Sequence, residues 1–158
     1  MTTSTTDNDA ALARQVAAYW TRRAYESVIT FTRREQRLRG YTQPQFWLLR
    51  HLDAHDLAED DQGATVAELE HAMAEYLREE DDLDTEADTL VARGWLEREG
   101  VRLRITEAGK AGRLELARHA PAIRALIHDG IDDADYVTTI KVLQRLIHNT
   151  REDRALER

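Results

Sequence analysis

The apolar residues of the chain recur mostly at steps of three and four, a period typical of amphipathic helices. Residues 9–37 are expected to form one long helix, with Asp9 as its N-cap. Its apolar positions include Leu12, Val16, Trp20, Val28 and Phe31. At 1.5 Å per residue such a helix is about 40 Å long, too long for a compact chain of 158 residues to cover alone. We therefore expect part of it to pack on a second subunit.

The middle of the chain predicts a group of shorter helices. Thr42 and Pro44 indicate the start of one helix, and the acidic stretch 53–63 after it is expected to be a loop. Thr65 and Glu68 form the capping-box pattern that begins the next. Residues 69, 73 and 77 are its expected inward positions. A further helix follows a short turn and ends at Gly94.

The pattern then changes to the alternation of a β-hairpin. Residues 95–98 and 101–105 predict two short strands, with a turn at Glu99 and Gly100. Thr106 is expected to cap a helix that reaches residue 127, kinked at Pro121. Asp132 or Asp133 caps the last helix. The order predicts a mainly α fold with a small β-hairpin, of the winged helix-turn-helix type. The long helices at both ends would hold an intertwined homodimer.

Composition agrees with a globular chain whose surface is heavily charged, because 42% of residues are hydrophobic and 33% are charged. The absence of cysteine excludes disulfides and thiolate metal sites. No apolar run approaches the roughly 20 residues that span a bilayer, and residues 1–8 lack the features of a signal peptide. We expect residues 1–8 to be a flexible tail, and the protein to be cytoplasmic with no membrane partner.

Several segments in this order resemble the MarR family of bacterial regulators. They are Thr42-Gln43-Pro44-Gln45-Phe46-Trp47-Leu48-Leu49, the helix pair at 65–93, Gly94-Trp95-Leu96, Arg104-Ile105-Thr106-Glu107-Ala108-Gly109, and the terminal stretch 135–149. The resemblance spans residues 9–150. It implies dimerisation through residues 9–38 and 110–158, and a winged-helix lobe at 39–109. It also implies a transcriptional regulator, a repressor that a small hydrophobic or aromatic ligand releases from double-stranded DNA.

The resemblance also implies site residues. The candidates for DNA binding are Arg98, Arg102, Arg104, Arg93 and Thr85. The candidates for ligand binding are Trp20, Phe46, Trp47, Arg50 and His51, although Trp20 and Phe46 are alternatively core residues. The candidates for the dimer interface are Leu12, Val16, Tyr136, Ile140, Leu143 and Ile147, the last four on one face of the final helix.

The charge of the presumed recognition helix departs from the family pattern. Residues 78–88 hold seven acids and one arginine, and the whole chain has a formal net charge of −8. The positions expected to face DNA are Glu80, Asp81, Asp82, Asp84, Thr85 and Asp88. Duplex DNA carries one negative charge per about 1.7 Å, so these acids would repel it. The hairpin arginines could contact phosphates or the minor groove, or could pair with the acidic helix.

Two hypotheses therefore remain. The chain is a DNA-binding regulator, or it is a MarR-fold dimer that no longer recognises DNA in the usual way. A dimer of the second kind would bind a small molecule or a protein, or act as an enzyme in the pocket where the family binds its ligands.

Catalytic and metal-binding patterns are weak. Asp82, Asp84, Glu86 and Asp88 alternate as in a calcium loop, but the central glycine is missing and Arg93 stands where the closing glutamate should be. His51 and His55 lie four apart without the glutamate of a zinc motif. Neither of the two serines, Ser4 and Ser27, lies in a nucleophile motif. We expect no catalytic residue, no metal and no cofactor, and do not expect an enzyme.

Overall fold

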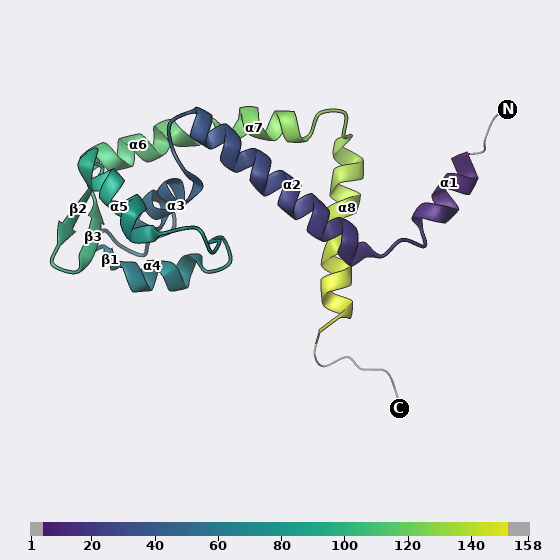
Figure 1. Ribbon diagram of the computed structural model, residues 1–158, viewed down its shortest axis with the longest axis horizontal. Helices are drawn as coiled ribbons and strands as arrows, with labels where there is room; N and C mark the ends of the chain where they lie inside the picture. Colours follow the sequence, from purple (N-terminus) through teal and green to yellow (C-terminus); the bar gives the residue numbers. More distant parts are fainter. Residues whose placement is uncertain (1–4, 152–158) are drawn as a thin grey trace. The chain divides into compact units, whose positions relative to one another are not determined.

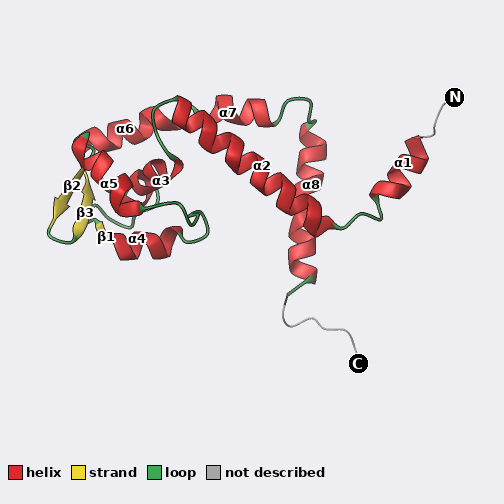
Figure 2. Ribbon diagram, viewed as in Figure 1, coloured by secondary structure: helices red, strands yellow, loops and turns green. Residues whose placement is uncertain are grey.

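The computed structural model describes residues 5–151, whose helices and strands are labelled in Figure 1. The chain divides into two units between Ala120 and Pro121. The first unit contains six helices and a small sheet, and the second contains the C-terminal helices (Figure 2). Each unit is described by itself below. Residues 1–4 of the expected flexible tail lie outside the described residues, whereas residues 5–8 are helical.

The N-terminal segment is two helices, α1 (Thr5–Leu12) and α2 (Ala17–Leu38). The prediction of one helix over 9–37, capped by Asp9, was therefore wrong. Arg14 and Gln15 donate their backbone N–H groups three residues back, to Ala11 and Leu12, which tightens and ends α1. Val16 then adopts an extended backbone as the N-cap of α2. Leu12 and Val16 consequently do not share a helix.

The helix starts predicted for the central lobe are confirmed. In α3 (Gln43–Leu52), the Thr42 side chain accepts from the Gln45 backbone N–H in a full capping box. In α4 (Val66–Met73), Thr65 does the same for Glu68. Each cap satisfies backbone donors that a helix leaves without internal partners. The following helix, α5 (Leu83–Ala92), is capped by Asp82 and ends before Gly94, whose φ is +75°.

The sheet has three antiparallel strands in the order β1-β3-β2. The predicted hairpin is present as β2 (Leu96–Glu99) and β3 (Arg102–Ile105), with Gly100 in its turn. β2 lies one residue later than predicted, so Glu99 belongs to the strand, and β3 begins one residue later than predicted. The third strand, β1 (Ala64–Thr65), was not predicted. It pairs Ala64 with Leu103 and Thr65 with Arg102, so it joins the loop before α4 to the hairpin.

One hydrophobic core holds this lobe together. It lies between α3, α4, α5, the sheet and α6 (Glu107–Ala117). Its buried members are Tyr41, Leu48, Leu49, Leu52, Leu69, Met73, Leu83, Ala87, Leu90, Leu96, Leu103, Ile105 and Leu116. Of the positions predicted to face inward on α4, Leu69 and Met73 are buried, while Leu77 lies beyond the helix and is half-buried.

The predicted helix over 107–127 is also two helices, so that prediction was wrong. α6 ends at Ala117, and α7 (Ala120–Ile127) begins after Arg118 and His119. Pro121 lies in the first turn of α7, where its missing N–H costs nothing, so it starts a helix and does not kink one.

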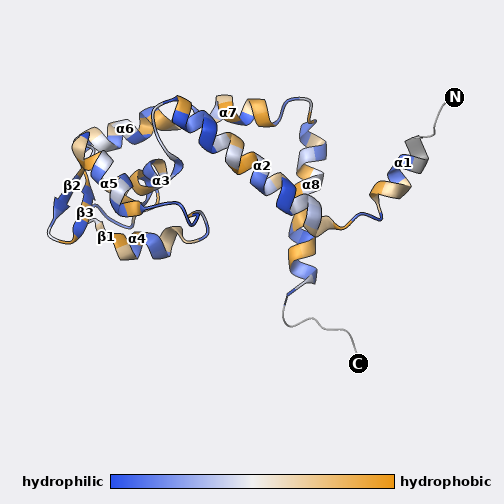
Figure 3. Cartoon of the chain, in the orientation of Figure 1, coloured by the Kyte–Doolittle hydropathy of each residue, from blue (hydrophilic) through white to orange (hydrophobic). Residues whose placement is uncertain are grey.

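The last helix is α8 (Asp133–Asn149), with Asp132 as its N-cap. None of its residues is buried, although Figure 3 shows hydrophobic residues along it. Among the described residues, no helix combines the length and apolar character needed to cross a membrane.

Gly109 is expected to be essential for the packing of α6 against the start of the hairpin. A Cβ at this position would collide with the Trp95 carbonyl oxygen, a backbone atom that cannot move away easily. Replacing Gly109 with alanine should lower the free energy of unfolding by about 2 kcal/mol or more, in the range of overpacked cores. The matched control is Ala108→Gly at the exposed neighbour, which should cost at most about 1 kcal/mol through helix propensity. Urea unfolding monitored by circular dichroism measures both, and equal losses would contradict the packing argument.

Candidate functional site

The candidate recognition helix α5 turns one face to the core and the other to solvent. Leu83, Ala87 and Leu90 are buried, which fixes the orientation of the helix. On the outer face the Asp84 and Asp88 side chains are 65% and 68% exposed. Thr85, the predicted base-contacting residue, is also exposed, but its hydroxyl donates to the Asp82 carboxylate at 3.0 Å. Asp82, Asp84 and Asp88 therefore all lie exposed to solvent.

Asp81 is an exception, because its side chain is only 7% exposed. Arg33 of α2 donates to both of its carboxylate oxygens, at 2.7 and 2.8 Å. The backbone N–H of Arg78 adds a third hydrogen bond at 2.8 Å. The prediction that Asp81 lies on the DNA-facing side of α5 was wrong, because its side chain is buried in an ion pair with Arg33. The sequence did not reveal this pair because the two residues lie 48 positions apart.

Arg33 is the centre of this buried group. Its Nε donates to the Gln43 side chain at 2.8 Å, and its Nη2 donates to the Tyr76 carbonyl at 3.2 Å. Although burial acts most strongly and in the opposite direction, hydrogen bonds from Arg33 and Arg78 hold the pKa of Asp81 below its usual value. Arg33 thus ties α2 to the start of α3 and to the turn between α4 and α5. No local pattern marks either residue, so sequence reasoning did not find them.

The hairpin arginine nearest α5 is paired with its acidic face. Nη2 of Arg98 lies 2.7 Å from Asp88 and 3.2 Å from Asp84. One guanidinium therefore bridges both outward carboxylates and offsets half of their charge. Of the two alternatives for the hairpin arginines, Arg98 follows the pairing with the acidic helix.

The other predicted DNA-binding arginines also have partners. Arg104 lies 2.7 Å from Glu99 across the hairpin, and Arg102 lies 3.5 Å from Glu68 on α4. Arg102 also donates to the Gly63 carbonyl. Both remain partly exposed on β3, at 31% for Arg104 and 44% for Arg102. Exposed pairs of this kind are worth little, so phosphates can compete for the arginines.

Arg93 differs from the hairpin arginines because it forms no ion pair with an acidic residue within the described part of the chain. Its guanidinium donates to the Gly40 carbonyl at 2.8 Å and lies 5.5 Å from the centre of the Trp95 ring. It therefore acts as a support for the end of α5.

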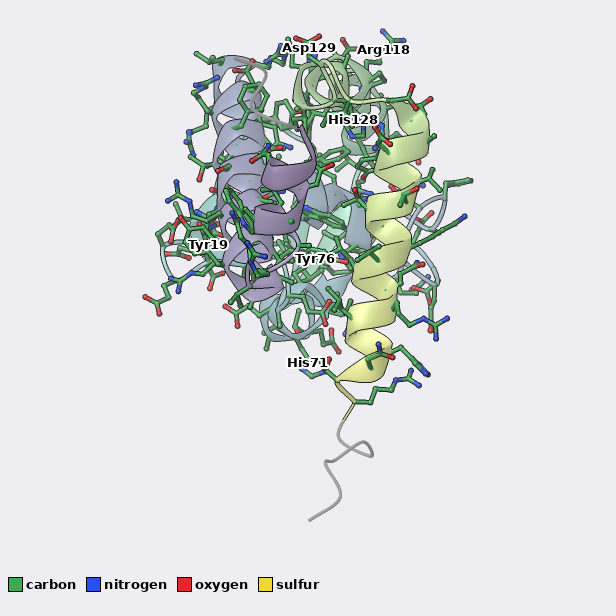
Figure 4. All side chains as sticks on the ribbon, turned by 90° about the vertical axis from the view of Figure 1, so that its right-hand side faces the viewer. Tyr19, His71, Tyr76, Arg118, His128 and Asp129 are labelled. Carbon is green, nitrogen blue, oxygen red and sulfur yellow. The ribbon has the colours of Figure 1, made fainter. Side chains whose placement is uncertain are left out.

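Four of the five predicted ligand-binding residues lie together on α3. Trp47 stacks on Tyr76 with ring centres 4.2 Å apart (Tyr76 is labelled in Figure 4). The Arg50 guanidinium lies 4.7 Å from the Trp47 ring centre and 5.9 Å from that of Phe46. The His51 ring lies 5.9 Å from Trp47. Phe46 is half-buried against the hydrophobic core, which agrees with the alternative prediction that it is a core residue.

Trp20 does not join this group. It is 53% exposed near the start of α2, where its ring contacts Tyr19 edge-on. Thirteen residues of helix, about 20 Å, separate it from Arg33, which contacts Tyr76. Its exposure also argues against the alternative that it is a core residue of this chain.

His51 and Asp53 show unusual environments at the end of α3. The Nε2 atom of His51 is buried and has no hydrogen-bond partner within the described chain. Burial, followed by the charge of Arg50, lowers the pKa of His51. Asp53, 1% exposed, accepts from Arg113 of α6 at 2.6 Å. Sequence reasoning placed Asp53 in an ordinary acidic loop and missed its buried pair.

The predicted dimer residues are exposed on single chains. Leu12 and Val16 are 51% and 70% exposed, and Ile140 and Ile147 are 36% and 69% exposed. Tyr136 and Leu143 are half-buried, and Tyr136 contacts the His128 ring within the C-terminal unit.

The alternating acids at 82–88, weighed above as a calcium loop, have other roles. Asp82 caps α5, and the others include partners of Arg98 and Gln45. Between residues 5 and 151, no three histidine or acidic side chains converge as metal ligands.

The fold is that of MarR-like winged-helix proteins. A MarR family transcriptional regulator from Silicibacter pomeroyi aligns with a TM-score of 0.65 at 15% identity, over 94% of this chain and 99% of that one. Wild-type MarR from E. coli aligns with a TM-score of 0.64 at 16% identity, over 84% of this chain and 96% of that one. BpsR of Bordetella bronchiseptica, whose DNA binding is regulated by 6-hydroxynicotinic acid, aligns with a TM-score of 0.58 at 21% identity, over 85% and 95%. No protein-family model and no curated protein matches the sequence.

Proposed function

We propose that this chain is a homodimeric, DNA-binding transcriptional regulator, a repressor that a small ligand releases from its operator. The proposal rests on the arrangement of α4, α5 and the hairpin. The fold that contains them aligns with MarR-type regulators over nearly the whole length of those proteins. In helix-turn-helix proteins the second helix enters the major groove, and an adjoining hairpin can reach the backbone or the minor groove. We infer that α5 and the β2–β3 hairpin have these two roles in this chain.

The acidic face of α5 is compatible with this role under a specific condition. Asp84 and Asp88 must either accept hydrogen bonds from cytosine amino groups or be neutralised. Arg98 already neutralises part of their charge, and Arg102 and Arg104 are free to exchange exposed acidic partners for phosphates. We infer a modest, salt-sensitive affinity for DNA.

One observation favours the second candidate, a MarR-fold dimer that does not recognise DNA in the usual way. Arg98, Arg102 and Arg104 are each engaged by a carboxylate. In that case the acidic face of α5 would meet a basic partner, or the protein would act through a ligand pocket. DNA-binding measurements separate the two candidates.

The proposed dimer uses α8. Tyr136, Ile140, Leu143 and Ile147 share one face, and no residue of the helix is buried in the single chain. An exposed apolar helix face of this kind is typical of an interface. A second copy of the chain would cover it by two-fold symmetry.

Charged residues on that face should dissociate the dimer. Ile140→Glu/Ile147→Glu is expected to convert the protein to monomer at micromolar concentration, because the two carboxylates would be buried without partners. Thr138→Glu/Arg145→Glu, on the opposite face of α8, should remain dimeric. Sedimentation equilibrium gives the masses. A dimer in the first variant would contradict the proposed interface.

The proposed effector would be an aromatic molecule bound beside Phe46, Trp47, Arg50 and His51. Aromatic walls with one cationic group suit an aromatic acid. The regulation of BpsR by 6-hydroxynicotinic acid supports this class of ligand.

The test of the proposal is an electrophoretic shift with fragments from upstream of the chain's own gene, at 50 and 200 mM salt. Salt-sensitive binding is expected. Arg102→Ala and Arg104→Ala should each weaken it by about 3- to 10-fold and reduce the salt slope by about one. Arg118→Ala, which removes a 76% exposed arginine from the end of α6, is the matched control and should change little. No shift at either salt concentration would favour the second candidate.

A further inference from the structure

A cavity lies at the end of α3, where His51, a member of the aromatic group around Trp47, forms part of its wall. It has a volume of about 550 Å³, within the range of ligand pockets. Its walls come from the end of α3, the 53–63 loop, α4 and β3. His51 and Arg102 both line it, although the sequence assigned them to different sites.

The chemistry of the walls is mixed and acidic. Leu52, Leu57 and Leu69 supply apolar surface. Three carboxylates and one guanidinium, that of Arg102, line the cavity, so negative charge exceeds positive by two; the carboxylates are those of Glu59, Asp60 and Glu68.

Two of the polar side chains that line the cavity have a defined protonation state at neutral pH. Hydrogen bonds from the backbone and side chain of Thr65 lower the pKa of Glu68, so this carboxylate is ionised at neutral pH. The lowered pKa of His51 keeps its ring neutral, so the ring adds no positive charge. Its Nε2 atom is buried and has no hydrogen-bond partner within residues 5–151.

The cavity is connected to the hairpin by short contacts. Arg102 donates to the Gly63 carbonyl and lies 3.5 Å from Glu68, both of which line the cavity. Gly63 has a φ of +77°, and a Cβ there would collide with the Leu103 carbonyl of β3. A molecule that draws Glu68 away from Arg102 therefore acts directly on β3.

We propose that this cavity binds a small organic cation, an ammonium group carried on an apolar body, and that its occupation changes the position of the hairpin. The excess of carboxylates selects for positive charge, and the leucine side chains select for an apolar body. The ammonium competes with Arg102 for Glu68, and Arg102 is one of the residues proposed to contact phosphate. The regulatory part rests on the proposed function, whereas binding of the cation does not.

Isothermal titration calorimetry on the protein without DNA tests the binding. The probes are phenethylamine and 2-phenylethanol, which share a ring and a chain of the same length but differ in charge, because the alcohol is neutral. Saturable binding of phenethylamine at one site per chain is expected, with at least 10-fold weaker binding of 2-phenylethanol. Equal binding of the two probes, or no binding of phenethylamine, would overturn the proposal.

Two variants locate the site. Glu59→Gln/Asp60→Asn should weaken phenethylamine binding at least 10-fold, because it removes both loop carboxylates. Glu70→Gln/Glu75→Gln makes the same change in charge outside the cavity, on α4 and just after it, and should leave binding unchanged. Equal effects of the two variants would mean that only net charge matters and would overturn the site.

An electrophoretic shift with phenethylamine tests the regulatory part separately. Release of DNA by wild type, and not by Glu59→Gln/Asp60→Asn, is expected. If calorimetry detects the site but DNA stays bound, the regulatory role is wrong and the site stands. If the protein binds no DNA at all, the proposed function fails while calorimetry still decides the site.

Discussion

Replacing Asp84 and Asp88 with asparagine is expected to tighten DNA binding about 10-fold or more at 50 mM salt. Both carboxylates lie on the exposed face of α5, and both are bridged by Arg98. A carboxylate about 4 Å from a phosphate costs about 1 kcal/mol in water, so removing two gives more than the 1.4 kcal/mol of a tenfold change. The variant also releases Arg98 for a phosphate contact, which should steepen the salt dependence.

The matched control is Glu107→Gln/Glu115→Gln, which removes the same charge from α6. It should change DNA affinity by less than about threefold, because charges farther than the Debye length, about 14 Å at 50 mM salt, are largely screened. Fluorescence anisotropy with a labelled duplex measures both variants. If Asp84→Asn/Asp88→Asn weakens binding, the carboxylates read bases. If it has no effect, α5 does not face DNA.

Removing the Asp81 side chain is expected to cost about 3–5 kcal/mol of stability, the usual range for a broken buried ion pair. Asp81→Ala leaves the buried guanidinium of Arg33 without its bidentate partner. Glu80→Ala, at a neighbouring carboxylate that is 67% exposed, should change the free energy of unfolding by at most about 0.5 kcal/mol. Urea unfolding measures both. A loss below about 1 kcal/mol in Asp81→Ala would contradict the structural role of the pair.

The same pair predicts a pH dependence. The pKa of Asp81 is lower in the folded protein than its unfolded value of about 3.9. The stability that it contributes is therefore fully present above about pH 4 and is lost as the pH falls through the lower folded pKa. The stability difference between wild type and Asp81→Asn should shrink as the pH falls below about 4. A difference that stays constant down to about pH 2 would show that the ionised carboxylate is not what matters.

Sequence patterns predicted the features that depend on neighbouring residues. Thr42 and Thr65 form capping boxes because their partners lie three residues away. Gly94 and Gly100 mark the end of α5 and the hairpin turn for the same local reason. The break at residues 13–16 escaped prediction because no glycine or proline marks it, and the periodic apolar positions continue across it.

Features that depend on distant residues could not be predicted. Arg33 and Asp81 look like ordinary surface charges until the fold brings them together. The two-residue strand β1 has no pattern of its own and exists through its pairing with β3. For the same reason, the sequence suggested that Arg98 could pair with the acidic helix but not that it bridges Asp84 and Asp88.

The central claim is that α5 and the hairpin of each subunit of a dimer contact double-stranded DNA. Hydroxyl-radical footprinting on the region upstream of the chain's own gene, at low salt, tests it most directly. Two protected segments with two-fold symmetry are expected, with centres about 10 base pairs apart or a multiple of that spacing. Protection should weaken in Arg102→Ala/Arg104→Ala. Uniform cleavage across the region at saturating protein would contradict the claim.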